Sequence, residues 1–332
     1  MQRQPRQAYS LCRNSISHAH STLKATIMRK FILNLALLLV AGSLTMSAAQ
    51  RSRRPAAKQQ KKEMMLQLYS IRDVIGNPEL YAKNHVEVFK KLRQYGFTGV
   101  EAANYNDGKF YGVSPEQYKK DCEAAGLNPL SSHATYWLNE TEIDNHDFAK
   151  AMKWWDVAIA AHKAAGMKYI VAPSGPMPKN LKQAQALCDY HNAVGAKVRA
   201  AGMKYGFHTH SGEYKKVEGT PWIEYMMKHI SPENMFWQMD TYWCVMAQEA
   251  PCEWFAKFPG RCKLLHIKDH YVVGKSGMVN YEAIFRDAKT CGLEGYVVEL
   301  EGTDGTIDSM EGVRQSAAYL ISKPWVKASY SK

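Results

Sequence analysis

The stretch Y-G-F-H-T-H-S-G-E-Y, residues 205–214, begins with β-forming residues and then carries two histidines two positions apart. Successive side chains of a strand point to opposite faces, so His208 and His210 share a face and can both reach a metal ion or a bound ligand. Taken alone, the pair is equally well explained as two hydrogen-bonded histidines. Three later β-like runs end in similar side chains: M-D at 239–240, L-L-H-I-K-D-H at 264–270 and V-V-E-L-E at 297–301. Four such endings in succession predict a functional site at the strand ends.

From residue 64 onward, short β-branched or aromatic runs alternate with longer segments of helical spacing. Five helix-like segments end in a glycine that is followed by an apolar residue, which is typical of a helix leading into a strand; these glycines are Gly96, Gly126, Gly166, Gly202 and Gly292. We expect strands at 64–70, 97–103, 128–134, 168–173, 203–210, 235–240, 262–268 and 295–301. We expect helices at 79–94, 114–125, 144–165, 179–201, 219–229, 250–258, 280–290 and 306–322.

Regular alternation of strands and helices requires parallel strands, because each helix must carry the chain back across the sheet. Eight units in roughly 260 residues match a closed (β/α)8 TIM barrel in number and size. An open doubly wound sheet is the alternative, but no G-x-G-x-x-G follows the first strand. The sequence therefore predicts an α/β fold with a single TIM-barrel catalytic domain over residues 63–332.

The first 62 residues have a different character. Residues 28–49 have the three parts of a signal peptide: a basic start, a short apolar run and a small-x-small end before Gln50. Residues 1–27 are interpreted as a non-native upstream extension, and residues 50–62 as a basic flexible tether. The apolar run is too short for a permanent membrane anchor. We expect export to the periplasm.

The formal charge of +12 is confined to this leader. Residues 1–62 hold twelve basic and no acidic residues, which leaves 31 basic and 31 acidic residues in 63–332. A neutral domain argues against a nucleic-acid partner. We expect a small-molecule sugar or glycoside as the partner, and a homo-oligomer is compatible with the sequence.

The cysteines of the domain are scattered and form no C-x-x-C pair, which argues against a structural zinc module. We expect buried thiols, and a disulfide between Cys244 or Cys252 and Cys262 is left open by the exported setting.

The carboxyl ends of barrel strands carry the active site. Two histidines and two carboxylates suit Mn, Zn, Co or Fe better than Ca or Mg. We therefore expect one divalent metal ion held by His208, Asp240, His266 and Glu299. The remaining ionisable side chains at strand ends are candidates for moving a proton, and the sequence does not rank them: Glu101, His133, His210, Lys268 and Glu301. Asp269 falls on the opposite face of its strand and is expected to contact a loop or helix.

Aromatic side chains crowd the same loops, and their faces stack on sugar rings. The strongest candidates for binding a sugar are Tyr242 and Trp243, directly after Asp240. Tyr136 and Glu213 are further candidates.

From about residue 64 to the end, the chain resembles the xylose-isomerase-like TIM-barrel family, often called sugar phosphate isomerases/epimerases. The matching pieces are G-F-T-G-V-E at 96–101, the stretch at 205–214, M-D at 239–240, L-L-H-I-K-D-H at 264–270, G-K-S-G-M-V-N-Y at 274–281 and Y-V-V-E-L-E at 296–301. The resemblance implies a divalent metal on Asp240, His266 and Glu299. This chain departs from the family by having His208 where most epimerases have Glu.

The function expected from these residues is abstraction of a proton α to the carbonyl of an unphosphorylated keto-sugar, with isomerisation or epimerisation as the outcome. Exported relatives resemble enzymes acting on 3-keto-glycosides, so a lyase that eliminates the C1 substituent after the same enolisation is an alternative. An endonuclease-IV-like metal hydrolase and a non-catalytic sugar-binding protein are further alternatives.

Overall fold

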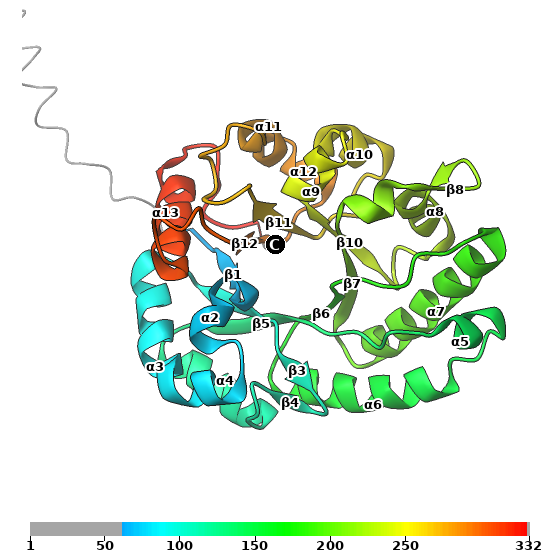
Figure 1. The fold of residues 1–332 in the computed structure, drawn as a ribbon, viewed down its shortest axis with the longest axis horizontal. Helices are drawn as coiled ribbons and strands as arrows, with labels where there is room; N and C mark the ends of the chain where they lie inside the picture. Colours follow the sequence, from blue (N-terminus) through cyan, green and yellow to red (C-terminus); the bar gives the residue numbers. More distant parts are fainter. Residues whose placement is uncertain (1–61, 331–332) are drawn as a thin grey trace, which may run out of the picture. The chain divides into compact units, whose positions relative to one another are not determined.

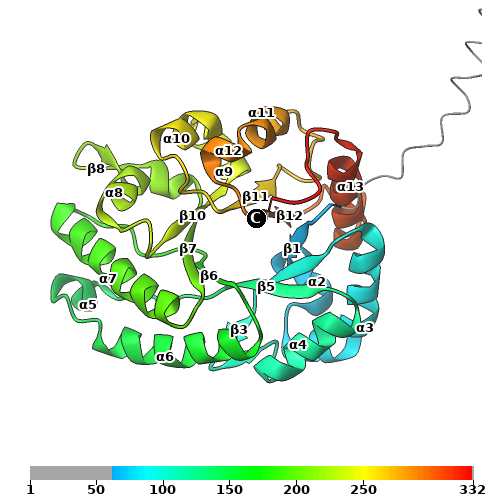
Figure 2. The ribbon, with the colours of Figure 1, turned by 180° about the vertical axis from the view of Figure 1, so that it is seen from behind.

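The computed structural model describes residues 62–330, and within them eight parallel strands close into one barrel (Figures 1 and 2). The order around the barrel is β1-β12-β11-β10-β7-β6-β5-β2. The strands are β1 (Met65–Gln67), β2 (Gly99–Ala102), β5 (Asn128–His133), β6 (Tyr169–Ala172), β7 (Lys204–Thr209), β10 (Phe236–Asp240), β11 (Leu264–Lys268) and β12 (Gly295–Glu299). The predicted (β/α)8 fold is confirmed.

Helices surround the strands, and α13 returns beside α3 where the first and last units of the barrel meet (Figures 1 and 2). The helices are α2 (Arg72–Ile75), α3 (Pro78–Tyr95), α4 (Pro115–Ala124), α5 (Glu140–Asp144), α6 (Ala149–Ala164), α7 (Leu181–Ala200), α8 (Trp222–His229), α9 (Thr241–Met246), α10 (Pro251–Lys257), α11 (Tyr281–Arg286), α12 (Ala288–Cys291) and α13 (Ser309–Ser322). Two 3-10 turns, η1 (Leu68–Ile71) and η2 (Ser211–Tyr214), follow β1 and β7. Short hairpins pair β3 (Tyr105–Asn106) with β4 (Lys109–Phe110), and β8 (Lys216–Val217) with β9 (Thr220–Pro221).

The expected helix at 144–165 begins later, as α6 at Ala149, and the separate short helix α5 ends at Asp144. His146 between them adopts a positive φ of 55°, which a continuous helix cannot contain. The expected helix at 280–290 is divided into α11 and α12, and α9 was not expected. Asp240 caps α9 through bonds from the backbone N–H groups of Tyr242 and Trp243 to its Oδ1. The five glycines that end helices all have positive φ, as predicted.

The barrel interior changes character along its axis. Near the amino ends of the strands it is filled by apolar side chains: Met65, Tyr169, Val171, Phe236, Leu264 and Val297. A Cβ on Gly206 would lie only 2.4 Å from the Phe236 ring, so the glycine makes room for that ring. On four of these strands the residue two positions further along is polar, and these residues form the floor of the site described below: Gln67, Gln238, His266 and Glu299.

All six cysteines of the described residues are free thiols, and five of them are buried. The disulfide alternatives with Cys262 are therefore not formed. None of the helices between residues 62 and 330 has both the length and the apolar character needed to cross a membrane. The expected extension, signal peptide and nearly all of the tether lie outside the described residues.

Candidate metal centre and active site

Strand register brings the expected metal ligands together at the carboxyl end of the barrel. Asp240 on β10 is paired with His266 on β11. His208 on β7 is paired with Gln238, which stands two positions before Asp240. Lys268 on β11 is paired with Glu299 on β12. Three consecutive strand pairings thus gather the side chains on one inward face.

The four expected ligands are all buried, and each contributes one donor atom to a group in which all atoms lie within 4.8 Å of one another. Two of these ligand atoms are unusual: His208 Nδ1 and Asp240 Oδ2 are buried without a hydrogen-bond partner among the described residues. Buried polar atoms normally have a partner, so a pair of unpartnered donors from two strands fits a cation. The donor set of two imidazoles and two carboxylates fits a transition-metal ion.

The charges within this group are strongly coupled. Burial alone would lower the pKa of His266, but Glu101 and Glu299 raise it to about 10. Burial alone would raise the pKa of Glu299, but the hydrogen bond and charge of His266, with the charge of Lys268, lower it to about 2. Burial raises the pKa of Asp240, and burial together with the neighbouring cations holds the pKa of His208 well below its ordinary value. The site therefore favours positive charge next to Glu299 and a neutral imidazole at His208.

Glu101 lies beneath this group with none of its surface exposed. Its Oε1 is 2.8 Å from His266 Nε2 and 3.0 Å from His133 Nε2, and it also accepts a bond from Gln67. Its Oε2 accepts bonds from Ser131 and Gln238. Both oxygens are occupied by protein donors, so this geometry disfavours Glu101 as the group that takes a proton from a substrate.

Two other candidate proton acceptors lie close to the ligand group. The His133 ring stacks on the His266 ring with centroids 5.2 Å apart, and its Nε2 is directed at Glu101. The His210 ring packs edge-on against the His208 ring at 4.7 Å. Both residues are partly exposed, whereas the four expected ligands are buried.

Lys268 and Glu301 form an ion pair at the rim. The Lys268 Nζ is also 3.5 Å from Glu299 Oε2 and lies over the Trp243 ring. Burial by itself would lower the pKa of Lys268, but the surrounding carboxylates raise it. Lys268 is therefore held as an ammonium, whereas the Glu301 side chain is 47% exposed and remains open to a ligand.

The expected sugar-binding residues occupy different surroundings. Trp243 lies between His210 and Lys268, and its buried Nε1 has no partner among the described residues. The Tyr242 hydroxyl is 3.2 Å from His270 Nδ1. The Tyr136 hydroxyl donates to Glu142, and buried Glu213 accepts a bond from the backbone N–H of His210. Trp243 is the member of this set whose polar atom has no hydrogen-bond partner among the described residues.

Three polar residues of the site were not predicted from the sequence: Gln67, Ser131 and Gln238. All are buried and bind Glu101. The period of two held a signal for two of them, because Gln238 shares the inward face with Asp240 and Ser131 shares it with His133. Asp269 points away from the site, as expected, and binds the following loop through the N–H of Gly274 and the hydroxyl of Ser276.

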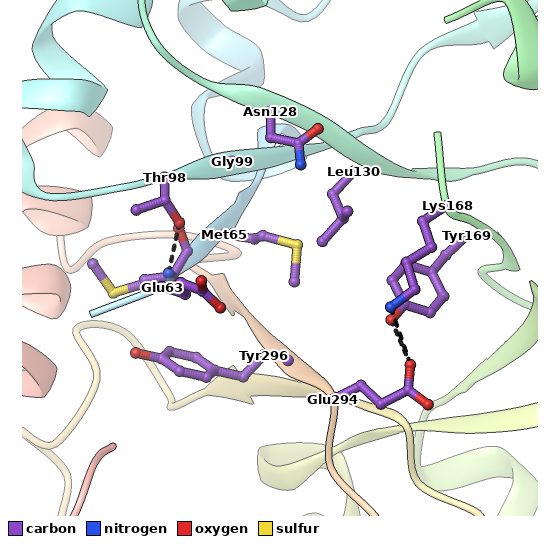
Figure 3. A pocket seen from close by; sticks show the side chains of 12 residues that line it. Glu63, Met65, Thr98, Gly99, Asn128, Leu130, Lys168, Tyr169, Glu294 and Tyr296 are labelled. Carbon is purple, nitrogen blue, oxygen red and sulfur yellow. Dashed lines mark hydrogen bonds and ion pairs between the residues drawn. The ribbon is translucent and has the colours of Figure 1, made fainter. Parts of the chain in front are cut away.

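A cavity of about 350 Å³ opens at the opposite, amino-terminal end of the barrel (Figure 3). Its lining includes first residues of strands, such as Met65 and Tyr169, and the Tyr169 hydroxyl donates to Glu294 at its edge. In TIM barrels this end serves stability while the carboxyl ends carry the chemistry. The cavity is therefore not assigned to the active site.

Comparison with known proteins agrees with this architecture. The family model described as "Xylose isomerase-like TIM barrel" matches residues 89–323. A sugar phosphate isomerase/epimerase of known structure from Parabacteroides distasonis is 34% identical, with a TM-score of 0.73, over 82% of this chain and 98% of its own. An inosose dehydratase of Clostridium perfringens is 25% identical over 74% of this chain and 92% of its own length. The IOLI protein, solved with a bound zinc atom, shares the fold at 12% identity, with a TM-score of 0.58, over 78% of this chain and 97% of its own. The chain belongs to the xylose isomerase-like TIM-barrel family.

Proposed function

We propose that this protein is a metal-dependent enzyme that removes a proton from the carbon next to the carbonyl of an unphosphorylated keto-sugar. The observation that carries the proposal is the buried ligand group, in which His208 Nδ1 and Asp240 Oδ2 have no partner in the described chain. A non-catalytic sugar-binding protein has no need for such a costly arrangement. Among the residues that the structure describes, the two candidate ligand groups share His208 and His266, which supports a single centre.

His208, Asp240, His266 and Glu299 would hold the ion, and a divalent ion supplies Lewis acidity at a carbonyl oxygen. The chain's own side chains then move the proton. As the α C–H bond breaks, its electron pair shifts toward the carbonyl, and His210, His133 or Glu301 accepts the proton. The Lys268 ammonium stands beside Glu299 and offers a positive charge at the same place.

The unphosphorylated substrate is supported by the loop after β11. The groups of this loop that would suit a phosphate, the N–H of Gly274 and the hydroxyl of Ser276, are instead bonded to the carboxylate of Asp269. The proposed export to the periplasm points in the same direction, since sugar phosphates are intracellular metabolites.

Elimination is the second candidate outcome, and the curated inosose dehydratases support it. Inosose dehydratases match over 92% of their own length, and a dehydratase expels water. Proton removal next to a carbonyl is followed by loss of the β-substituent in a lyase and by reprotonation in an isomerase or epimerase. The same site therefore serves water loss from an inosose or loss of the C1 group from a 3-keto-glycoside.

The test is turnover in deuterated water with metal-loaded protein, using free ketoses, an inosose and a 3-keto-glycoside. We expect NMR to show deuterium at the α-carbon of an isomerised product, or loss of the α-proton in an unsaturated product. Turnover with every α-proton retained would refute the mechanism.

The proton acceptor is identified by the conservative variants His133→Asn, His210→Asn and Glu301→Gln. General-base assistance is worth about 10²–10⁴ in rate. At least one variant should lose that much kcat while keeping metal content and substrate affinity. Glu294→Gln, at the far end of the barrel, is the matched control and should retain wild-type turnover.

A further inference from the structure

We propose that Glu101 is a positioning residue: it holds His266 in the tautomer that leaves Nδ1 free for the metal ion. The proposal rests on the metal centre proposed above and assigns a new role to a carboxylate that does not reach the substrate.

The two nitrogens of His266 face different partners. Nε2 is 2.8 Å from Glu101 Oε1, and Nδ1 is 3.2 Å from Glu299 Oε2, on the side of the ligand group. Both oxygens of Glu101 already accept hydrogen bonds from other side chains, Oε1 from Gln67 and Oε2 from Ser131 and Gln238, so the carboxylate faces His266 as an acceptor. The nitrogen facing Glu101 must then carry a proton. A histidine that carries its proton on Nε2 can bind a metal only through Nδ1.

Glu101 is itself fixed from several directions. Its five donors come from β1, β5, β10 and β11: Gln67, Ser131, His133, Gln238 and His266. The carboxylate has about four lone-pair sites, so donors fully occupy it and it has no freedom to turn. This explains why a charged side chain is kept at a position with no exposed surface.

An irregularity of the sheet creates this arrangement. The pairing of β2 with β5 shifts by one residue between Val100 and Glu101, so that Glu101 stands opposite Ser131 and Leu130 is bypassed. Bulges of this kind redirect a side chain and are frequent beside active sites. The shifted register puts the Ser131 hydroxyl 2.6 Å from Glu101 Oε2.

Glu101 also constrains the position of the proton on His133. Its Nε2 is 3.0 Å from Glu101 Oε1 and 3.0 Å from Gln238 Oε1, and both of these atoms are acceptors. Its Nε2 therefore also carries a proton. One carboxylate thus sets the proton position of two stacked imidazoles, of which one is a metal ligand.

The experiment uses the full chain with ¹⁵N-labelled histidine, loaded with Zn²⁺. In wild-type protein we expect His266 to show a metal-bound Nδ1 and a protonated Nε2 in ¹⁵N–¹H spectra, assigned by comparison with His266→Gln. Glu101→Gln places an amide against donors and should weaken Zn²⁺ binding about 10–100-fold, measured by chelator competition on folded protein. Ser131→Ala removes one hydrogen-bond donor to Glu101 and leaves both histidines bonded, so it should weaken Zn²⁺ binding by less than about threefold. Glu294→Gln should bind as wild type does.

A zinc-bound Nε2 on His266 in wild-type protein would overturn the proposal, as would wild-type zinc affinity in folded Glu101→Gln. If the Glu101→Gln chain does not fold, the wild-type tautomer decides alone. A wild-type chain that takes up no zinc on His266 would instead remove the proposed metal centre, and this inference with it. A merely structural Glu101 would lower the melting temperature of the variant without changing zinc affinity or the tautomer.

Discussion

Individual residues at the mouth of the barrel have divided roles that their spacing alone does not reveal. His208 Nδ1 and Asp240 Oδ2 have no hydrogen-bond partner among the described residues, whereas both oxygens of Glu101 already accept hydrogen bonds. All three are fully or almost fully buried and sit near strand ends. The difference lies in what surrounds each atom, and this is why one carboxylate fits a metal ligand and the other fits a support for histidines.

Asp240→Ala provides the sharpest test at this scale. It removes one of the two unpartnered donors, so metal affinity should fall by at least about 100-fold, more than for loss of a supporting residue. Added Zn²⁺ or Mn²⁺ should raise the melting temperature of the wild type and leave that of the variant unchanged. Glu213→Gln changes another buried carboxylate, in the 3-10 turn η2 and outside the ligand group, and should keep the ion. Unchanged metal content in Asp240→Ala would show that the ligand set is misassigned.

At the scale of elements, helix α7 shows how closely the outer layer is packed. Gly195 lies in its interior, where glycine normally costs about 1 kcal/mol relative to alanine. Here a Cβ would come within 1.9 Å of the carbonyl oxygen of Asn234, in the segment between α8 and β10. The helix needs this glycine in order to pack against the backbone that leads into β10.

Gly195→Ala should therefore destabilise the protein in spite of its better helix propensity. We expect a loss of about 1–3 kcal/mol in the free energy of unfolding, because rigid backbone must move. Urea denaturation of both proteins measures this difference in the free energy of unfolding. Gly302→Ala, where the added Cβ meets nothing within 4 Å, should stay within about 0.5 kcal/mol of wild type. A more stable Gly195→Ala protein would contradict the close contact.

For the whole molecule, buried histidines outside the site should govern the response to acid. Burial lowers the pKa of His162 to about 4 and that of His191 to about 3. Both are neutral in the folded protein, while in the unfolded chain each takes up a proton near its ordinary pKa of 6.5. Their contribution to stability is complete above pH 6.5 and is lost as the pH falls toward 4 and 3.

At pH 5 this loss amounts to about 2 kcal/mol for each histidine, from about 1.4 kcal/mol per pH unit. Unfolding free energies measured in urea between pH 7.5 and 5 should show the decline. The double variant His162→Gln/His191→Gln is less stable at neutral pH, but its stability should decline less steeply over the same range. Parallel curves for the two proteins would exclude these histidines as the cause.

Much of this molecule was predictable from residue order alone. The period of two placed His208, Asp240, His266 and Glu299 on inward faces near strand ends, and five glycines marked where helices stop. These features are local, because side-chain alternation and helix termination depend on neighbouring residues. The eight-strand barrel followed from the alternation of elements.

Only the tertiary structure decided what each polar residue contacts. Glu101, Gln67, Ser131 and Gln238 come from four different strands, and a one-residue shift between β2 and β5 brings them together. Such a shift changes which side chains meet across the barrel without any sign in the local pattern. The close approach of α7 to the backbone before β10 at Gly195 and the bonds to Glu101 have the same origin. They depend on contacts between segments far apart in the chain, which alternation and spacing do not specify.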